Sequence, residues 1–314
     1  MRRLATIFGG TGFIGRHLVP RLAKLGYDIR IATRHADAVL PLTTQGRVGQ
    51  VMPVRVDLGS ETAIAAAVEG AGLVVNLIGI LAEKRSGDFN RLQGELPGRI
   101  GRAAAASGVQ RLVHVSAIGA DPASPSAYAR SKATGEEALR AAFPAATILR
   151  PSIIFGPEDQ FFNRFAGMAQ MLPFMPVICG GTRFQPVYVG DVADAVVAAT
   201  ERPEAVGQTY ELGGPRIATF RELMGYVLEV TGRQRRLVTL PDGLVRLQAR
   251  LGEHLPGQPL TRDQLAQLRR DNVVAEGAQG LSDLGLEAKP MEAVVPGYLS
   301  RYRVGGGKQR VLGG

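Results

Sequence analysis

The sequence of 314 residues has few of the side chains that build disulfides and metal sites. Cys179 is the single cysteine, so no disulfide can form within the chain, and we interpret it as a buried packing residue rather than a reactive thiol. The histidines His17, His35, His114 and His254 are scattered, with no pair four residues apart, which predicts no metal site. No apolar run approaches the roughly 18 residues of a membrane-spanning helix. The sequence contains no internal repeat either.

Positive charge is concentrated late in the chain, which has 37 lysines and arginines against 28 acidic residues. Residues 233–270 hold eight arginines and three acids, and residues 301–314 hold four basic residues and no acid. This late basic region predicts contact with an acidic protein surface or with anionic lipid headgroups, and a solvated arginine-rich surface is the alternative. Nucleic acid is not predicted as a partner, because no aromatic residues interleave with these arginines.

A glycine-rich turn near the start is the strongest local signal. The apolar run Leu4–Phe8 reads as a buried strand, and apolar residues at helical spacing follow the turn as far as Gly26. A glycine turn between a strand and a helix is typical of dinucleotide binding, because it lets the pyrophosphate approach the backbone and the helix N-terminus. The cofactor-binding residues predicted here are Gly9, Gly10, Thr11, Gly12, Phe13, Ile14, Gly15 and Arg16.

Alternating strands and helices follow this turn and predict a doubly wound, Rossmann-type α/β fold with a parallel sheet. Further strands are expected at 28–35, 51–56, 73–79, 111–116 and 145–150, and one intervening helix at Asp88–Ser107. We expect a cofactor-binding domain at residues 1–155, to which elements of 184–202 return. A smaller, mostly helical substrate or docking region is expected at 156–300, followed by a mobile basic tail at 301–314.

The elements of the second half are predicted from local patterns. A strand is expected over Phe184–Val189, and a helix over Phe220–Val230, with Thr219 and a glutamate three residues later as a capping box. Pro241–Leu251 carries leucines on one stripe and arginines on another, as an amphipathic helix does. A further short helix is expected over Thr261–Arg270.

The second strand ends where the adenosine ribose of a dinucleotide is recognised. An NAD site would place an acidic residue there for the 2′-hydroxyl, whereas this chain has Arg34 and His35, with Arg16 near the same corner. Two guanidinium groups suit a 2′-phosphate, which predicts NADP(H) rather than NAD(H). Solvated arginines are the alternative.

The ends of the third and fourth strands complete the predicted cofactor site. Asp57 and Leu58 follow the third strand, where an aspartate lies near the adenine edge or caps the helix that starts near Ser60. The fourth strand is expected to pass under the cofactor ribose with its last residues, Asn76, Leu77, Ile78 and Gly79.

Ser116, Tyr128 and Lys132 are the candidate catalytic residues, and they also belong to the predicted cofactor site. Tyr128 and Lys132 are four residues apart on one helix face, and Ser116 ends the fifth strand. A tyrosine hydroxyl can act as general acid or base, a nearby ammonium lowers its pKa and binds the ribose, and a serine hydroxyl orients a carbonyl or alcohol. His114, two residues before the serine, is expected to be a packed core or interface histidine.

These residues, with the glycine turn and Leu149–Gly156, resemble the short-chain dehydrogenase/reductase superfamily in its extended or atypical branch. The resemblance implies a catalytic role for Ser116, Tyr128 and Lys132. It also implies that the loop beside the nicotinamide is formed by Pro151, Ser152, Ile153 and Ile154.

Four further stretches narrow the resemblance to the nucleotide-binding accessory subunits of respiratory complex I and their bacterial relatives. The stretches are Arg150–Phe165, Gln185–Ala193, Thr261–Leu265 and Leu281–Leu286. In that family the implied role is structural: a bound NADPH stabilises a subunit near the quinone-binding region. The absence of a targeting extension favours a bacterial protein in the cytoplasm or at the cytoplasmic face of the inner membrane.

The sequence therefore supports two main hypotheses. In the first, the chain is an accessory or assembly subunit of complex I that docks through its basic last third, where Pro241–Leu251 meets protein or an anionic membrane surface. In the second, it is an active NADP(H)-dependent oxidoreductase on a lipophilic carbonyl, alcohol or quinone-like compound. A redox sensor, in which cofactor occupancy controls a partner, is a third alternative.

Overall fold

The computed structural model describes residues 3–241, 243, 245 and 261–305. The chain divides into two compact units. Unit 1 comprises residues 1–151, 189–212 and 275–287, and unit 2 comprises residues 152–188, 213–274 and 288–314. Most of the predicted amphipathic helix Pro241–Leu251, and residues 306–314 of the predicted tail, lie outside the described residues.

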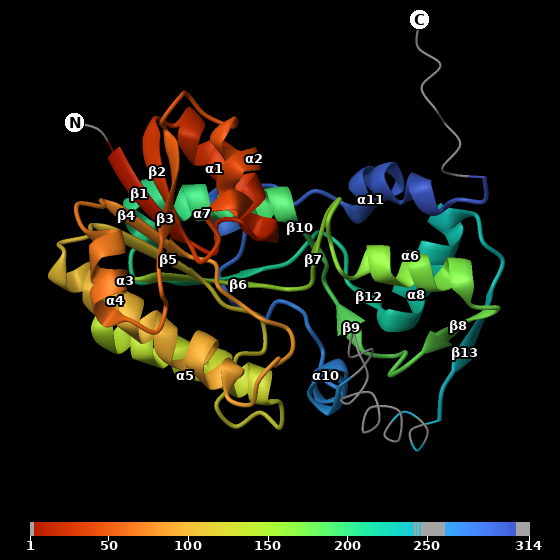
Figure 1. Cartoon of the computed structure of the whole chain (residues 1–314). Coiled ribbons are helices and arrows are strands. Elements are labelled where there is room, and N and C mark those ends of the chain that lie inside the picture. Colours follow the sequence, from red (N-terminus) through yellow and green to blue (C-terminus); the bar gives the residue numbers. More distant parts are fainter. Residues whose placement is uncertain (1–2, 242, 244, 246–260, 306–314) are drawn as a thin grey trace, which may run out of the picture. The chain divides into compact units, whose positions relative to one another are not determined.

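Unit 1 is built on a seven-stranded sheet in which every neighbouring pair of strands is parallel (Figure 1). In spatial order its strands are β3 (Val51–Arg55), β2 (Tyr27–Thr33), β1 (Arg3–Phe8), β4 (Leu73–Asn76), β5 (Arg111–Val115), β6 (Thr147–Pro151) and β11 (Thr209–Leu212). The order reverses between β1 and β4, which is the point where doubly wound sheets bind ligands. The Rossmann-type fold predicted from the sequence is confirmed.

Helices cover both faces of this sheet (Figure 1). The helices of unit 1 are α1 (Phe13–Lys24), α2 (Leu40–Thr43), α3 (Glu61–Val68), α4 (Leu96–Ala106), α5 (Ala127–Ala142) and α7 (Val189–Glu201), with short 3₁₀ turns at Ala36–Val39, Pro203–Ala205 and Ser282–Leu284. Helices α3, α4 and α5 pack along one face, and α1 and α7 pack together on the other. Because both faces are covered, β4 is buried along its whole length, which explains its continuous apolar sequence.

The helix predicted over Asp88–Ser107 is interrupted near its start. A π-helix, Asn90–Glu95, precedes α4. Pro97 explains the break, because it has no N–H to donate to the carbonyl of Gln93 in an α-helical ladder. That carbonyl faces α5 at Gly135, where a Cβ atom would overlap the oxygen and lie 3.1 Å from the carbonyl carbon. The residue pattern predicted the helix but not its irregular first turns.

Unit 2 combines helices with very short strands. The elements described in it are β7 (Ile154–Phe155), α6 (Phe162–Met171), β8 (Phe174–Val177), β9 (Arg183–Phe184), β10 (Val187–Tyr188), β12 (Ala218–Thr219), α8 (Phe220–Thr231), β13 (Arg236–Thr239), α10 (Arg262–Leu268), α11 (Met291–Leu299) and a 3₁₀ turn at Ser300–Tyr302. The strands form three two-stranded sheets, β7 with β10, β9 with β12, and β8 with β13. A core rich in phenylalanine packs between α6, α8 and α11.

Two expectations for unit 2 have different outcomes. The single strand expected at Phe184–Val189 is wrong: it is two separate strands, because Pro186 cannot donate to a continuous ladder. The helix start at Thr219 is confirmed, because its side chain accepts from the Glu222 N–H while the Glu222 carboxylate accepts from the Thr219 N–H.

Candidate functional site

The carboxyl ends of four parallel strands place the predicted cofactor residues along one edge of the sheet. Phe8, the last residue of β1, is in register with Ala32 of β2 and with Asn76 of β4. Asn76 is in turn in register with His114 of β5. The residues that follow these strands therefore meet at the same edge, around the reversal of strand order.

The glycine turn lies against the loop after β4 and leaves no room for side chains. Gly9 has a φ of +79°, and a Cβ there would lie 3.1 Å from the carbonyl carbon of Leu77. A Cβ on Gly10 would lie 3.0 Å from the side chain of Ile31. At Gly15 it would overlap the carbonyl oxygen of Gly10 and lie 2.5 Å from its carbon. Each glycine therefore permits a close approach: Gly9 to the loop after β4, Gly10 to β2, and Gly15 within the turn itself.

Helix α1 begins directly at this turn with an uncapped N-terminus. Gly12 is the N-cap residue, no side chain caps the helix, and its first turn contains no acidic residue. Free N–H groups and the positive end of the helix dipole form a site for an anion. The chemistry and the closeness of this turn fit the pyrophosphate of a dinucleotide.

Two arginines flank the turn on the side of β2. Arg34 directly follows β2, is exposed, and its guanidinium forms no ion pair or hydrogen bond with the part of the chain that the structure describes. Its neighbour His35 is held in a local turn, because its N–H donates to Thr33 Oγ1 at 3.1 Å. Arg16 Nε donates to the carbonyl of Thr11 at 3.1 Å, which ties its side chain to the glycine turn. Among the residues that the structure describes, no acidic side chain pairs with either guanidinium group.

Asp57 and Leu58 form the turn between β3 and α3. Asp57 Oδ1 accepts from the Gly59 N–H at 2.8 Å, and the Leu58 carbonyl accepts from Arg99 at 2.7 Å. The cap of α3 is Ser60, whose side chain accepts from the N–H of Ala63. Asp57 therefore does not cap α3, because Ser60 does. The other role predicted for Asp57 is a position near the adenine edge.

The structure brings Lys132 to the end of β5, beside Ser116. Lys132 is only 4% exposed, and its Nζ donates to the carbonyl of Val115 at 3.3 Å. The same Nζ lies 5.9 Å from the ring centre of Tyr128, one turn earlier on α5. Ser116 is 4% exposed and its Oγ has no hydrogen-bond partner among the described residues. A buried hydroxyl that lacks a hydrogen-bond partner and lies near a buried ammonium fits a binding site. A polar ligand there would supply the missing hydrogen bond.

Burial controls the charge of the groups at this edge. It lowers the pKa of Lys132 from 10.5 to about 8, and the Glu136 carboxylate opposes that shift. Burial, with repulsion from Lys132, lowers the pKa of His114 to about 3, so this histidine is neutral. Asn76 Oδ1 accepts from the Ile78 N–H, so its Nδ2 donates to His114 Nδ1 at 3.2 Å. The proton of His114 is then on Nε2, which has no partner among the described residues.

The free-energy cost of burying the charged Lys132 ammonium predicts that the stability of the protein depends on pH. Between pH 8 and 10.5 this lysine is more protonated in the unfolded chain than in the native one, so the free energy of unfolding rises with pH in that window. Below pH 8 the lysine is charged in both states, and the native state bears the full free-energy cost of burying that charge. We expect the ligand-free Lys132→Met variant to be more stable than wild type at pH 7 by on the order of 3 kcal/mol. Urea unfolding from pH 7 to 10.5 measures the difference, which should shrink with rising pH; a constant difference contradicts the assignment.

The four predicted nicotinamide-loop residues divide between the units. Pro151 ends β6 in unit 1, and the other three begin unit 2. Ser152 Oγ donates to Asn272 Oδ1 at 2.7 Å, and the same oxygen accepts from the Ile153 N–H at 3.1 Å. Asn272, which the sequence did not single out, therefore fixes this loop within unit 2.

The sequence pattern does not single out two further residues near this site, both in the segment after β4. Phe89 packs edge-on against Tyr128, with ring centres 5.9 Å apart. Gln93 is fully buried and accepts from the Ile80 N–H at 2.8 Å. Pro97 could have signalled an irregular helix here, but no sequence pattern signals where a buried amide finds its partners.

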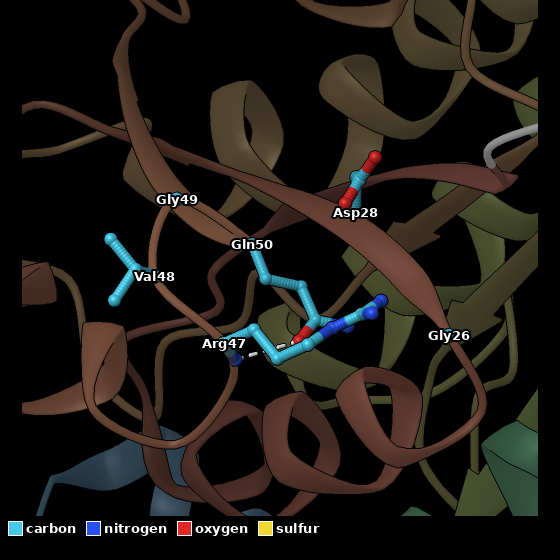
Figure 2. A pocket seen from close by; sticks show the side chains of 6 residues that line it. All are labelled: Gly26, Asp28, Arg47, Val48, Gly49 and Gln50. Atoms are coloured by element: carbon cyan, nitrogen blue, oxygen red, sulfur yellow. Dashed lines mark hydrogen bonds between the residues drawn. The ribbon is translucent and has the colours of Figure 1, made fainter.

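A separate hollow of about 260 Å³ lies at the opposite ends of the strands (Figure 2). Its lining residues are Gly26, Asp28, Arg47, Val48, Gly49 and Gln50, at the starts of β2 and β3. It is therefore remote from the glycine turn. Among the described residues, no cluster of histidine, cysteine or acidic side chains is suited to a metal ion, and no helix is long and apolar enough to cross a membrane.

Comparison with known proteins agrees with this geometry. A model of the NAD dependent epimerase/dehydratase family matches residues 5–213. The mitochondrial NADH dehydrogenase [ubiquinone] 1 alpha subcomplex subunit 9 of Arabidopsis thaliana is 36% identical, over 96% of this chain and 79% of its own. The ceramide reductase of Caulobacter vibrioides is 35% identical, over 77% of this chain and 74% of its own. The NADPH complex of an Escherichia coli quinone oxidoreductase superposes with a TM-score of 0.75 at 19% identity, over 94% and 99% of the two chains, which shows a shared fold.

Proposed function

Because this chain belongs to the NAD dependent epimerase/dehydratase family, we propose that it binds NADP(H) and serves as an accessory or assembly subunit of a respiratory complex I. The observation that carries the proposal is the 36% identity to a mitochondrial NADH dehydrogenase subunit, which extends over 96% of the chain and so includes unit 2. The dinucleotide part is supported by the glycine turn and the uncapped start of α1. In this role the cofactor stabilises unit 1 and its turnover is not required.

The charge of unit 2 supports a docking role. Unit 2 holds seventeen lysines and arginines against nine acidic residues, whereas unit 1 holds twenty against nineteen. Nearly all of the excess positive charge of the chain therefore belongs to the unit that does not carry the glycine turn. Such a surface favours an acidic protein partner or anionic lipid, at the cytoplasmic face of a bacterial inner membrane.

Purification from the native membrane tests the docking role. We expect a tagged chain to co-purify with complex I subunits, and Arg236→Glu, at an exposed position of unit 2, to weaken that association at physiological salt. Arg55→Glu, at an exposed position of unit 1, is the matched control. A chain recovered without any complex I subunit, at low as well as physiological salt, would contradict the proposal.

An active reductase is the second candidate function, and the assembled Ser116, Tyr128 and Lys132 favour it. When bound, the nicotinamide supplies or accepts a hydride. Tyr128 would hold the proton for the substrate oxygen, Lys132 would keep that hydroxyl acidic, and the Ser116 hydroxyl would orient the carbonyl. The reductase relative and the quinone oxidoreductase fold point to lipophilic carbonyls and quinones for a first screen. NADPH oxidation that Tyr128→Phe abolishes would establish turnover.

The preference for NADP(H) rests on Arg34 and Arg16. We expect Arg34→Asp to weaken NADPH binding about 10- to 100-fold while NADH binding changes little, because a charge-assisted contact to the 2′-phosphate is lost and replaced by repulsion. Titration calorimetry with both nucleotides measures the ratio. Equal losses for NADPH and NADH would show that Arg34 does not recognise the 2′-phosphate.

A further inference from the structure

Gln93 connects two parts of the candidate site through a single buried side chain. It is 1% exposed, and its two amide atoms have different partners. Oε1 accepts from the N–H of Ile80, in the loop after β4, at 2.8 Å. Nε2 donates to Ser131 Oγ on α5 at 3.0 Å, and that hydroxyl donates to the carbonyl of Tyr128 at 2.8 Å. The loop after β4 and the Tyr128–Lys132 turn of α5 are therefore joined through one amide.

Gly79 lies at the corner where these parts meet. A Cβ atom on Gly79 would lie 3.4 Å from Lys132 Nζ and 3.6 Å from Gln93 Oε1. The ammonium and the amide oxygen therefore lie near the same backbone position. Gly79 is the last of the four residues predicted to pass under the cofactor ribose, so a ribose bound there would lie close to Lys132.

The backbone that carries Gln93 is itself fixed against α5. Gln93 lies in the π-helix Asn90–Glu95, and its carbonyl faces Gly135 so closely that a Cβ there would overlap it. Such π-turns within helices often occur at functional sites, where they redirect a side chain. Here the turn directs a buried amide between the loop and α5, and the absence of a Cβ at Gly135 lets the backbone of Gln93 lie directly against that helix.

We infer that Gln93 is a positioning residue that holds the loop after β4 at a fixed distance from Tyr128 and Lys132, so that both sides of this corner contact the nicotinamide ribose together. The inference rests on the proposed binding of NADP(H). An amide suits this role because it accepts on one side and donates on the other, whereas a carboxylate only accepts and a thioether is a weak acceptor that cannot donate.

A matched pair of buried glutamines gives the test. Gln50 is also buried, with its Oε1 accepting from the Arg47 N–H at 2.8 Å (Figure 2) and its Nε2 donating to two carbonyls, but it lies at the opposite edge of the sheet. We expect Gln93→Met to weaken NADPH binding at least about tenfold and Gln50→Met to leave it within about twofold, because both variants lose a buried amide but only one loses the connection. Equal losses, or none in Gln93→Met, would overturn the inference.

The titration of Lys132 provides a readout that requires no cofactor. Besides the Val115 carbonyl, the charged or titratable groups near this ammonium among the described residues are Glu136, His114 and Tyr128, whose ring centre lies 5.9 Å away. NMR of the Lys132 side chain in the ligand-free protein should show a midpoint raised by at least about one pH unit in Gln93→Glu, because the new carboxylate faces the ammonium across Gly79. If Lys132 titrates with an unchanged midpoint in folded Gln93→Glu, the side chain at position 93 does not lie close to the Lys132 ammonium, and the inference is wrong. If wild type does not bind NADPH, the proposed function fails, while this titration still tests whether residue 93 and Lys132 lie close together at Gly79.

Discussion

Gly15→Ala is expected to abolish measurable NADPH binding, with a loss of about 100-fold or more, and to lower the free energy of unfolding by about 1–3 kcal/mol. The added Cβ would overlap the carbonyl oxygen of Gly10 and lie 2.5 and 2.6 Å from its carbonyl carbon and Cα. These are backbone atoms of the β1–α1 turn, so they cannot move aside as a flexible side chain can. The turn must open, which displaces the N–H groups at the start of α1 from the pyrophosphate. Calorimetric titration with NADPH and urea unfolding measure the two effects.

Gly225→Ala is the matched control for that substitution. Gly225 lies inside α8, and a Cβ there would have no heavy atom within 4 Å. An alanine in an open helical position should stabilise the protein by about 0.5–1 kcal/mol, because it reduces the entropy lost on folding. NADPH affinity should stay as in wild type. Full affinity and full stability in Gly15→Ala would contradict the close contact of turn and helix.

The sheet of unit 1 was predictable because its sequence signals are local and strong. The β4 residues Leu73–Asn76 are all buried, and the first three are apolar, as expected for a strand of a parallel sheet that is covered on both faces. The glycine turn indicates which strand precedes the proposed phosphate site, and the φ of +79° at Gly9 is a backbone conformation that favours glycine. The spacing of apolar residues along each strand and helix was therefore enough to predict the architecture without knowledge of long-range contacts.

The environment of the candidate catalytic residues was much less predictable. The spacing of Tyr128 and Lys132 gives their shared helix face, but the burial of Lys132 comes from β5 and from the loop after β4. Ser152 illustrates the same difficulty, because its hydroxyl donates to Asn272, 120 residues later. Partners so distant along the chain leave no periodic signal, so sequence reasoning can propose the residues without their hydrogen bonds or their pKa values.

Unit 2 was harder to predict because its strands are too short to show a period. β9 and β12 contain two residues each, and their pairing depends on the fold around them. By contrast, α8 was found easily, because its capping box at Thr219 is a local signal that requires no tertiary information. In unit 2, elements with a local sequence signal could be predicted, whereas elements that depend on contacts between residues far apart in the sequence could not.

Arg150→Met is expected to lower the free energy of unfolding by about 3–5 kcal/mol, because it leaves a buried carboxylate without its partner. Arg150 of β6 binds Glu136 of α5 with two hydrogen bonds, from Nε at 2.9 Å and from a terminal nitrogen at 2.6 Å. The Glu136 side chain is only 5% exposed, and the same guanidinium lies 3.6 Å from Glu211 of β11. This pair therefore fastens the helix that carries Lys132 to the sheet. Urea unfolding at pH 7 measures the loss.

Two further variants separate the buried charge from the lost contact. Arg216→Met removes an ion pair with Glu292 whose side chains are 52% and 43% exposed, so it should cost at most about 1 kcal/mol. The double variant Arg150→Met/Glu136→Met removes both members of the buried pair and should regain part of the stability lost in Arg150→Met, because Glu136 is no longer left without its partner, while Glu211, whose side chain is 12% exposed, still lacks the guanidinium. If the double variant is instead as unstable as the sum of its two single variants, the loss comes from the packing of α5 on the sheet and the explanation by an unpaired charge is wrong.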